Sequence, residues 1–266
     1  MLPQADDFKA ECDALYALLK PLRDEDFAQP TLFKSWTIND VLGHLHIWNW
    51  AAHMSLVDEP AFTEYLSKIM HPDLADQPLR EREKIFLSGQ SGQALLEEWH
   101  SYADQMAASF RDVDPKQRLK WAGPDMSARS SVTARLMETW AHAQAVYDAL
   151  GVDRAEKDHI QNIVILGVNT FSWTYATRRE TPPGPLPYLA LMAPSGAMWE
   201  FGEPSETDCI KGDAVEFCRV VTQVRNIADT NLDVRGAVAT DWMSKAQCFA
   251  GPPETPPAAG ARHRAA

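Results

Sequence analysis

The chain has 266 residues, of which 45% are hydrophobic and 23% are charged, and it carries a formal net charge of −12 at pH 7. This length and apolar content suit one large or two ordinary domains with real cores, which excludes a chain that is disordered throughout. The acidic balance opposes binding to phosphate backbones, and no apolar run approaches the roughly 20 residues that a membrane helix needs.

The first 180 or so residues predict an all-α domain, in which helices alternate with polar or Pro-containing breaks. The second helix has a clear start at Thr37, whose hydroxyl can cap free amides while Asp40 favours the positive end of the helix dipole. The fourth ends before Gly151, a residue suited to the left-handed turn after a helix. We expect helices near residues 8–19, from 37 onward, 91–110, 127–150 and 157–178, with short helices between 60 and 85 as a cover.

The character of the chain changes at the Pro-rich run 182–185, after which short strands and turns replace long helices. We therefore expect a helical domain over residues 1–180 and a small α+β domain over residues 181–250. Residues 251–266 are rich in Pro and Ala and read as a disordered tail. Within the second domain we expect strands at 186–191, 198–201 and 232–236, and helices from 212 and over 239–249.

Two features concern the cellular setting. The chain opens without the basic and apolar segments of a secretion signal, so we expect a soluble cytoplasmic protein without a membrane partner. Its cysteines form no C-x-x-C pair, which argues against a zinc knuckle or a disulfide framework. We expect four reduced and mostly buried thiols, at Cys12, Cys209, Cys218 and Cys248.

Two stretches about ninety residues apart carry side chains that can bind a metal. The first reads W-T-I-N-D-V-L-G-H-L over residues 36–45, and the second reads R-L-M-E-T-W-A-H over residues 135–142. If both are helical, Glu138 and His142 lie one turn apart on one face, and His44 adds a third ligand from another helix. Two imidazoles and one carboxylate form a facial triad, which holds a divalent metal and leaves positions open for water or substrate.

Simpler explanations exist for the same residues. A Glu-x-x-x-His pair on a helix is often a solvent-facing ion pair, and His44 could be a core histidine. Apolar neighbours of all three residues favour burial, and buried ionisable groups are costly unless they are paired or bound to a metal. A helical bundle is also a known place for metal sites.

The remaining histidines are weaker ligand candidates. His46 lies about 200° around the helix from His44, so we exclude it from the triad. His53, His71 and His100 have polar or charged neighbours and are expected at the surface, and His263 falls in the tail.

The two runs, W-T-x-x-D-V-x-x-H-L and R-x-x-E-x-W-x-H, resemble the signature helices of the DinB-like superfamily, and within it the mycothiol-dependent maleylpyruvate isomerase branch. The resemblance covers about residues 5–180 and implies an up-and-down four-helix bundle. It also implies a divalent metal, most often zinc, at the residues that match His44, Glu138 and His142. The runs G-P-D-M-S at 123–127 and A-P-S-G at 193–196 resemble a little-studied subgroup described mainly as metal-binding proteins.

The C-terminal part resembles the small sterol-carrier-like α+β domain that is appended to the isomerase. Similar stretches also carry a wyosine-formation label, which fits an acidic chain poorly. The resemblance as a whole implies an open-sided metal that binds a low-molecular-weight thiol or polarises a substrate oxygen. A thiol bound in this way is deprotonated near neutral pH and becomes a nucleophile.

Several other residues are candidates for the reaction itself. Arg135 lies on roughly the same helix face as the second motif's histidine and could hold a carboxylate, while Ser127 lies near the ligands in sequence. A surface charge and a helix cap are their structural alternatives. His159 could line a pocket or transfer a proton. Trp48 and Trp140 are candidates for a cofactor pocket, although aromatic residues at helical spacing also build cores.

Three functions therefore compete. The first is a metal- and thiol-dependent enzyme, an isomerase or a transferase, that acts on a small organic substrate as a monomer or homodimer. The second is a non-catalytic protein that binds a small molecule and whose metal only braces the bundle. The third is an accessory to wyosine modification of tRNA, which would bind RNA in a salt-sensitive way.

Overall fold

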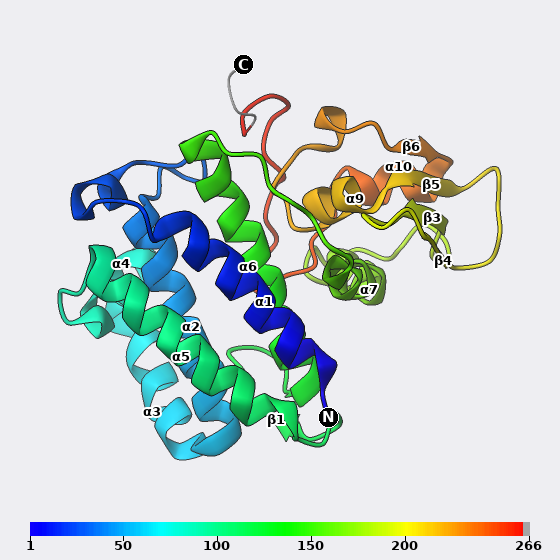
Figure 1. Cartoon of the computed structure of the whole chain (residues 1–266). Helices are drawn as coiled ribbons and strands as arrows, with labels where there is room; N and C mark the ends of the chain where they lie inside the picture. Colours follow the sequence, from blue (N-terminus) through cyan, green and yellow to red (C-terminus); the bar gives the residue numbers. More distant parts are fainter. Residues whose placement is uncertain (263–266) are drawn as a thin grey trace. The chain divides into compact units, whose positions relative to one another are not determined.

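The computed structural model describes residues 1–262, which divide into two compact units, the first ending at Ala149 and the second beginning at Leu150. The first unit is a bundle of long helices that run side by side (Figure 1). Its α5 packs against both α1 and α2. The long helices are α1 (Pro3–Leu19), α2 (Ile38–Val57), α5 (Gly92–Arg111) and α6 (Ala128–Leu150). The predicted four-helix bundle is confirmed.

Short elements connect the long helices. Between α2 and α5 lie α3 (Glu59–Ile69) and α4 (Leu79–Lys84), where the sequence predicts short helices over the bundle. The 3-10 turns of this unit are η1 (Asp24–Ala28), η2 (Pro72–Leu74) and η3 (Ile85–Leu87). A two-stranded antiparallel pair, β1 (Arg118–Leu119) and β2 (Met126–Ser127), precedes α6.

The start of α2 is fixed by a reciprocal cap. The Asp40 amide donates to Thr37 Oγ1 at 3.1 Å, and the Thr37 amide donates to Asp40 Oδ2 at 2.9 Å. Two amides that have no partner within the helix are thereby satisfied. At the far end of α6, Gly151 has a φ of 69°, the left-handed conformation that the sequence predicts there.

The second unit combines helices with a four-stranded sheet in the order β4-β3-β5-β6. Strand β3 pairs antiparallel with β4 and parallel with β5, and β5 pairs antiparallel with β6. Helix α9 packs against α7 and against β3 and β5. The elements are η4 (Asp158–Ile160), α7 (Gln161–Asn169), α8 (Phe171–Ala176), β3 (Tyr188–Met192), β4 (Met198–Phe201), β5 (Cys209–Asp213), α9 (Ala214–Val221), η5 (Ile227–Asp229), β6 (Asp233–Arg235) and α10 (Ala237–Met243).

The units divide about thirty residues before the Pro-rich run, because α7 and α8 belong with the sheet and its helices. Gly167 on α7 lies so close to Phe217 that an added Cβ would be 3.0 Å from that ring. On α8, the Trp173 indole donates to the Phe249 carbonyl at 3.2 Å. The change of composition near residue 182 therefore marks the first strand and not the boundary between the units.

The described part of the C-terminal segment contacts the rest of the second unit. The Glu254 amide donates to Gln247 Oε1 at 2.9 Å, and Arg262 Nη1 donates to the Gln223 carbonyl at 2.7 Å. These are hydrogen bonds of ordinary length in a segment that the sequence predicts to be disordered. His263 lies outside the described residues.

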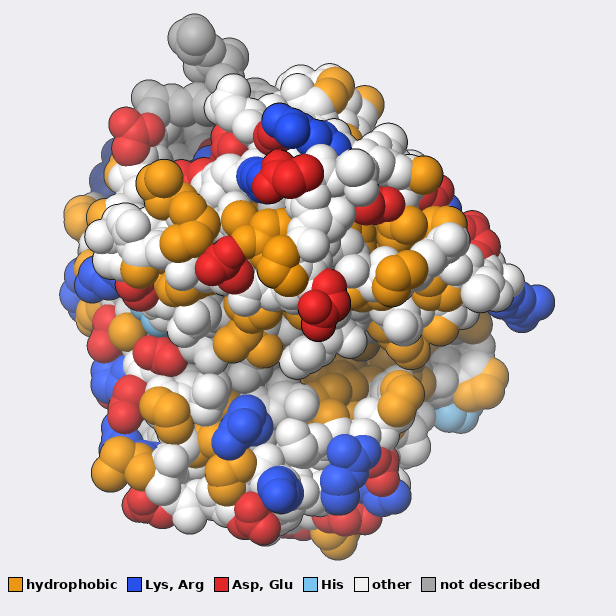
Figure 2. All heavy atoms as spheres, turned by 90° about the vertical axis from the view of Figure 1, so that its right-hand side faces the viewer, with side chains coloured by type: hydrophobic (Ala, Val, Ile, Leu, Met, Phe, Trp, Pro, Cys, Tyr) orange, Lys and Arg blue, Asp and Glu red, His pale blue; other side chains and the backbone are white. Residues whose placement is uncertain are grey.

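Three further features concern the cysteines, the polarity of the helices and the surface. All four cysteines are buried and free, as predicted. No helix within residues 1–262 has the length and apolar character to cross a membrane. Figure 2 shows acidic and basic side chains interspersed with hydrophobic ones on the face that it draws.

Candidate metal centre

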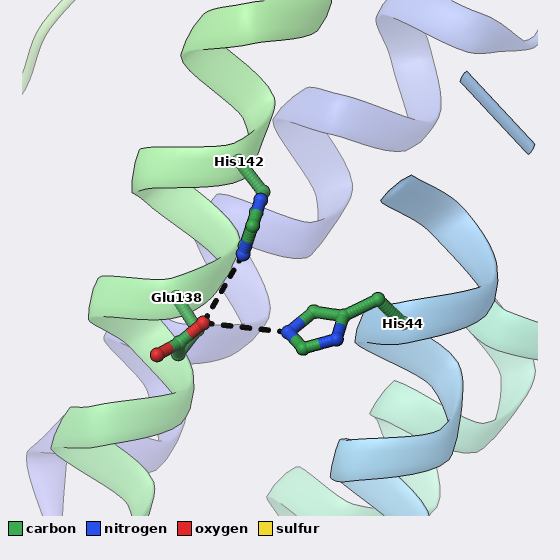
Figure 3. A group of neighbouring side chains, drawn as sticks. All are labelled: His44, Glu138 and His142. Carbon is green, nitrogen blue, oxygen red and sulfur yellow. Dashed lines mark ion pairs between the residues drawn. The ribbon is translucent and has the colours of Figure 1, made fainter. Parts of the chain in front are cut away.

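Three side chains from two helices converge inside the first unit (Figure 3). His44 projects from α2, while Glu138 and His142 lie one turn apart on α6. Glu138 Oε2 is 3.5 Å from His44 Nε2 and 3.3 Å from His142 Nε2. The structure thus brings together the three residues that the sequence predicts as a ligand set.

The spacing of these atoms fits a divalent metal. Zinc binds nitrogen and oxygen ligands at about 2.0–2.2 Å, so neighbouring ligand atoms of a tetrahedral site lie about 3.4 Å apart. The two measured separations, 3.3 and 3.5 Å, lie on either side of that value. The side chains of His44, Glu138 and His142 keep 11%, 24% and 11% of their surface exposed. A metal held there would have three protein ligands and a side that solvent or a substrate can reach.

A fourth charged residue, Glu83 on α4, contacts the centre from behind His44. Its Oε1 lies 2.8 Å from His44 Nδ1 and accepts a hydrogen bond of 2.6 Å from Trp48 Nε1. Only 2% of Glu83 is exposed. The sequence did not indicate this role, because residues 80–84 read R-E-R-E-K, a run typical of a solvated surface.

Aromatic rings surround the two histidines. The Trp36 ring is stacked on His142, with centroids 5.7 Å apart and planes 4° apart, and Phe33 meets the same imidazole edge to face at 4.9 Å. Trp36 also contacts His44 at 5.4 Å, and Trp48 lies 6.3 Å from it. Trp36 opens the first motif, but nothing in its spacing distinguished a ring at the site from a core residue.

The charges of the centre are strongly coupled. Burial alone would lower the pKa of His44, but the carboxylates of Glu83 and Glu138 outweigh it and raise that pKa to about 9. Burial alone would raise the pKa of Glu138, yet its contacts with His142 and His44 hold it well below the usual value. Burial lowers the pKa of His142. The centre therefore presents a carboxylate that is already ionised and, in His142, an imidazole that is readily neutral, whereas His44 must lose a proton before it can bind a metal.

Arg135 lies inside the bundle and is only 2% exposed, so it is not the surface charge that was its structural alternative. Its Nε donates to Asn49 Oδ1 at 2.9 Å, which links α6 to α2. Arg135 Nη2 and Asn49 Nδ2 are buried without a hydrogen-bond partner among the described residues. The guanidinium is thus packed among protein atoms, close to the carboxylates of Glu138 and Glu83, and a substrate carboxylate would need a rearrangement to reach it.

Ser127 immediately precedes α6, whereas Glu138 and His142 lie in the middle of that helix. Its Oγ accepts a hydrogen bond of 3.1 Å from the Ser130 amide, which is the geometry of a helix cap. Eleven residues separate it from Glu138, about 16 Å along a helix. The structure therefore does not bring Ser127 to the centre.

The other two candidates lie elsewhere. Trp140 is fully buried in the bundle core, about 200° around α6 from Glu138. His159 belongs to the second unit, where it lies in η4 and its carbonyl accepts a hydrogen bond of 2.9 Å from Asn162 Nδ2. Of the two predicted cofactor-pocket residues, only Trp48 adjoins the centre.

Two further histidines on α2 point away from the triad. His46 Nε2 is 3.7 Å from Glu98 Oε1, in agreement with its exclusion from the triad. The expectation of a surface position was wrong for His53, which is 9% exposed. Its two ring nitrogens lie 2.9 Å from the Tyr102 hydroxyl and 2.8 Å from the Ser109 hydroxyl. Helix α5 supplies both partners and covers this face of α2, which the polar neighbours in sequence could not indicate.

A second cluster of metal-binding residue types lies on the outer surface of α1 and α5. It contains Asp13, His100 and Asp104. The Lys9 ammonium lies 2.8 Å from both carboxylates, so a protein cation already offsets part of the negative charge of this cluster. The triad in the bundle is the better candidate for a metal.

Comparisons with known proteins identify a family model and two similar proteins. Residues 8–147 match the family model described as the mycothiol maleylpyruvate isomerase N-terminal domain. Two proteins of Mycobacterium tuberculosis, from strains CDC 1551 and H37Rv and both named as uncharacterized, are each 35% identical over 253 residues. Each alignment covers 94% of this chain and 96% of the relative.

Two solved structures share the fold. One is the mycothiol-dependent maleylpyruvate isomerase, with a TM-score of 0.52 and 13% identity, and the other is a variant of that enzyme with a histidine replaced by alanine, with a TM-score of 0.50 and 15% identity. Both alignments cover 82% of this chain and 87% of the solved chain. At this level of identity the likeness concerns the fold.

Proposed function

Because this chain belongs to the mycothiol maleylpyruvate isomerase N-terminal domain family, we propose that it is a metal- and thiol-dependent enzyme, an isomerase or a transferase, that acts on a small organic substrate. The metal is divalent, zinc by preference, and its ligands are His44, Glu138 and His142. The observation that carries the proposal is the pair of separations from Glu138 Oε2 to the two imidazole nitrogens, 3.5 and 3.3 Å.

Each ligand residue has a distinct task in this proposal. A bound divalent ion would supply a Lewis acid that lowers the pKa of a thiol. Glu138 contributes the negative charge that offsets part of the metal's charge, and the two imidazoles bind as neutral donors. Trp36 and Phe33 hold the His142 ring by stacking and edge contacts, which limits its rotation. Glu138 is the most exposed of the three, so solvent reaches the centre mainly on its side, where a thiol would have access.

The test combines metal content with turnover. The purified protein is stripped with a chelator, reconstituted with zinc, and assayed with mycothiol and two substrate classes: a cis double bond conjugated to a carbonyl, and an alkylating electrophile. We expect one zinc per chain and thiol-dependent turnover of one class. His44→Ala should lose both zinc and turnover. His71→Ala is the matched control, because that imidazole is 55% exposed and should change neither.

Two outcomes would contradict the proposal. Turnover that survives chelation, or that His44→Ala retains, would exclude a metal-dependent reaction at this centre. Zinc that raises the melting temperature while neither substrate class is converted would instead favour the non-catalytic, metal-braced alternative.

A further inference from the structure

The buried carboxylate of Glu83 has a specific position behind the centre. One of its oxygens, Oε1, contacts both His44 Nδ1 and Trp48 Nε1, two side chains that lie one turn apart on α2. A buried carboxylate is costly unless its oxygens are paired, and these two N–H groups pair Oε1 from the same helix face. Glu83 thus contacts one nitrogen of the His44 ring, Nδ1, while the other nitrogen, Nε2, faces Glu138.

This contact decides which nitrogen of His44 can bind a metal. A neutral imidazole has one N–H and one lone pair, and a carboxylate at Nδ1 retains the proton there. The lone pair then lies on Nε2, on the side of Glu138 and His142. The same contact fixes the rotation of the ring, so the nitrogen is aimed before any metal arrives.

The first motif itself holds the segment that carries this carboxylate, residues 79–87. Asp40 lies 3.4 Å from Lys84 Nζ and 3.8 Å from Arg80 Nη1, so its charge anchors α4 at two points. Gly43 leaves room for η3, since a Cβ there would lie 2.6 Å from Leu87 Cδ1. Two positions of the motif that bind no metal therefore dock the segment against α2.

We propose that Glu83 is a positioning residue for His44, and that residues 79–87 are an integral part of the metal centre rather than a cover over the bundle. The inference rests on the proposed metal site. It assigns a role to a residue outside both signature motifs, and it gives a reason for Asp40 of the first motif and for Gly43, which precedes the histidine of that motif.

The experiment compares Glu83→Gln with Glu64→Gln, a control on α3 whose side chain is 68% exposed and pairs with Lys68 at 2.7 Å. Zinc affinity is measured by competition with a chromogenic chelator. We expect a loss of about 10- to 100-fold for Glu83→Gln, the range typical of such supporting partners, and no change for Glu64→Gln. Equal affinity of Glu83→Gln and the unsubstituted chain would overturn the positioning role.

A second measurement does not depend on metal binding. In the metal-free protein, the indole N–H proton resonance of Trp48, assigned with Trp48→Phe, should shift in Glu83→Gln and stay in place in Glu64→Gln. An unshifted resonance would overturn the placement of Glu83. If the unsubstituted chain bound no zinc while the resonance still shifted, the proposed function would fail and the placement of Glu83 would stand.

A third variant covers the case in which Glu83→Gln does not fold. Glu83→Asp retains the buried charge but withdraws the carboxylate by one methylene group. We expect it to fold, as followed by circular dichroism, and to bind zinc with an affinity between those of Glu83→Gln and the unsubstituted chain. Affinity equal to that of the unsubstituted chain would count against the positioning role.

Discussion

Buried charge governs the interior of the bundle at the scale of single residues. Glu83, Glu138 and Arg135 all lie around the same pair of helices, and the carboxylates are close enough to Arg135 to oppose the lowering of its pKa by burial. Arg135 makes no direct ion pair among the described residues and relies on Asn49 for its hydrogen bond. The negative charge that opposes this guanidinium therefore comes from the carboxylates, whereas its hydrogen-bond acceptor is Asn49.

The free energy of unfolding should therefore respond differently to removal of Asn49 alone and to removal of Asn49 and Arg135 together. Asn49→Leu removes the acceptor of a buried charged donor, and we expect it to lower the free energy of unfolding by about 2 kcal/mol in urea titrations. Arg135→Met added to Asn49→Leu removes the unpaired charge as well and should recover most of the loss. A double variant that is less stable than Asn49→Leu would contradict the prediction.

Asp40 combines two tasks at the scale of the element. It caps the first turn of α2 through Thr37 and anchors α4 through Lys84 and Arg80. Burial alone would raise its pKa, but the hydrogen bonds from Thr37 and the charge of Lys84 hold it below the usual value. The ionised form is therefore the one that the folded protein favours.

The sign of the pH dependence follows from that shift. Because the folded pKa is depressed, Asp40 contributes stability above the unfolded value, about 3.9, and this contribution is lost as the pH falls through the folded pKa. Asp40→Asn keeps an oxygen for the cap but removes the charge. We expect it to be less stable than the unsubstituted chain by about 1 kcal/mol at pH 6, with a difference that shrinks below pH 4. Unfolding measured at several pH values checks this, and a difference independent of pH would contradict it.

Elements with strong periodicity were predictable, and those that depend on docking were not. The apolar spacing of α1, α2, α5 and α6 and the end signals of α2 and α6 are local to each helix, so the sequence alone predicts them. The position of Glu138 one turn from His142 follows from the same periodicity, whereas the approach of His44 to them depends on how the two helices meet. The sequence did not predict the burial of Glu83 and His53, because that burial depends on the packing of α4 and α5 against α2. Strand β5 was missed because its five residues run directly into α9, which was expected to begin at Gly212.

At the scale of the whole molecule, two units of different architecture share one acidic chain. The family model covers residues 8–147, within the bundle, whereas the two mycobacterial relatives match 94% of the chain and so include most of the second unit. With a net charge of −12 and cations interspersed with acids on the face in Figure 2, the molecule suits a small substrate better than a phosphate backbone. The chemistry is proposed for the first unit, where the triad lies.

The position of a bound metal tests the central claim most directly. Crystals of the zinc-reconstituted protein, measured at the zinc absorption edge, would show the ion by its anomalous scattering. We predict one peak at about 2.0–2.2 Å from His44 Nε2, His142 Nε2 and a Glu138 oxygen. A peak at Asp13, His100 and Asp104 instead, or no peak between α2 and α6, would contradict the account.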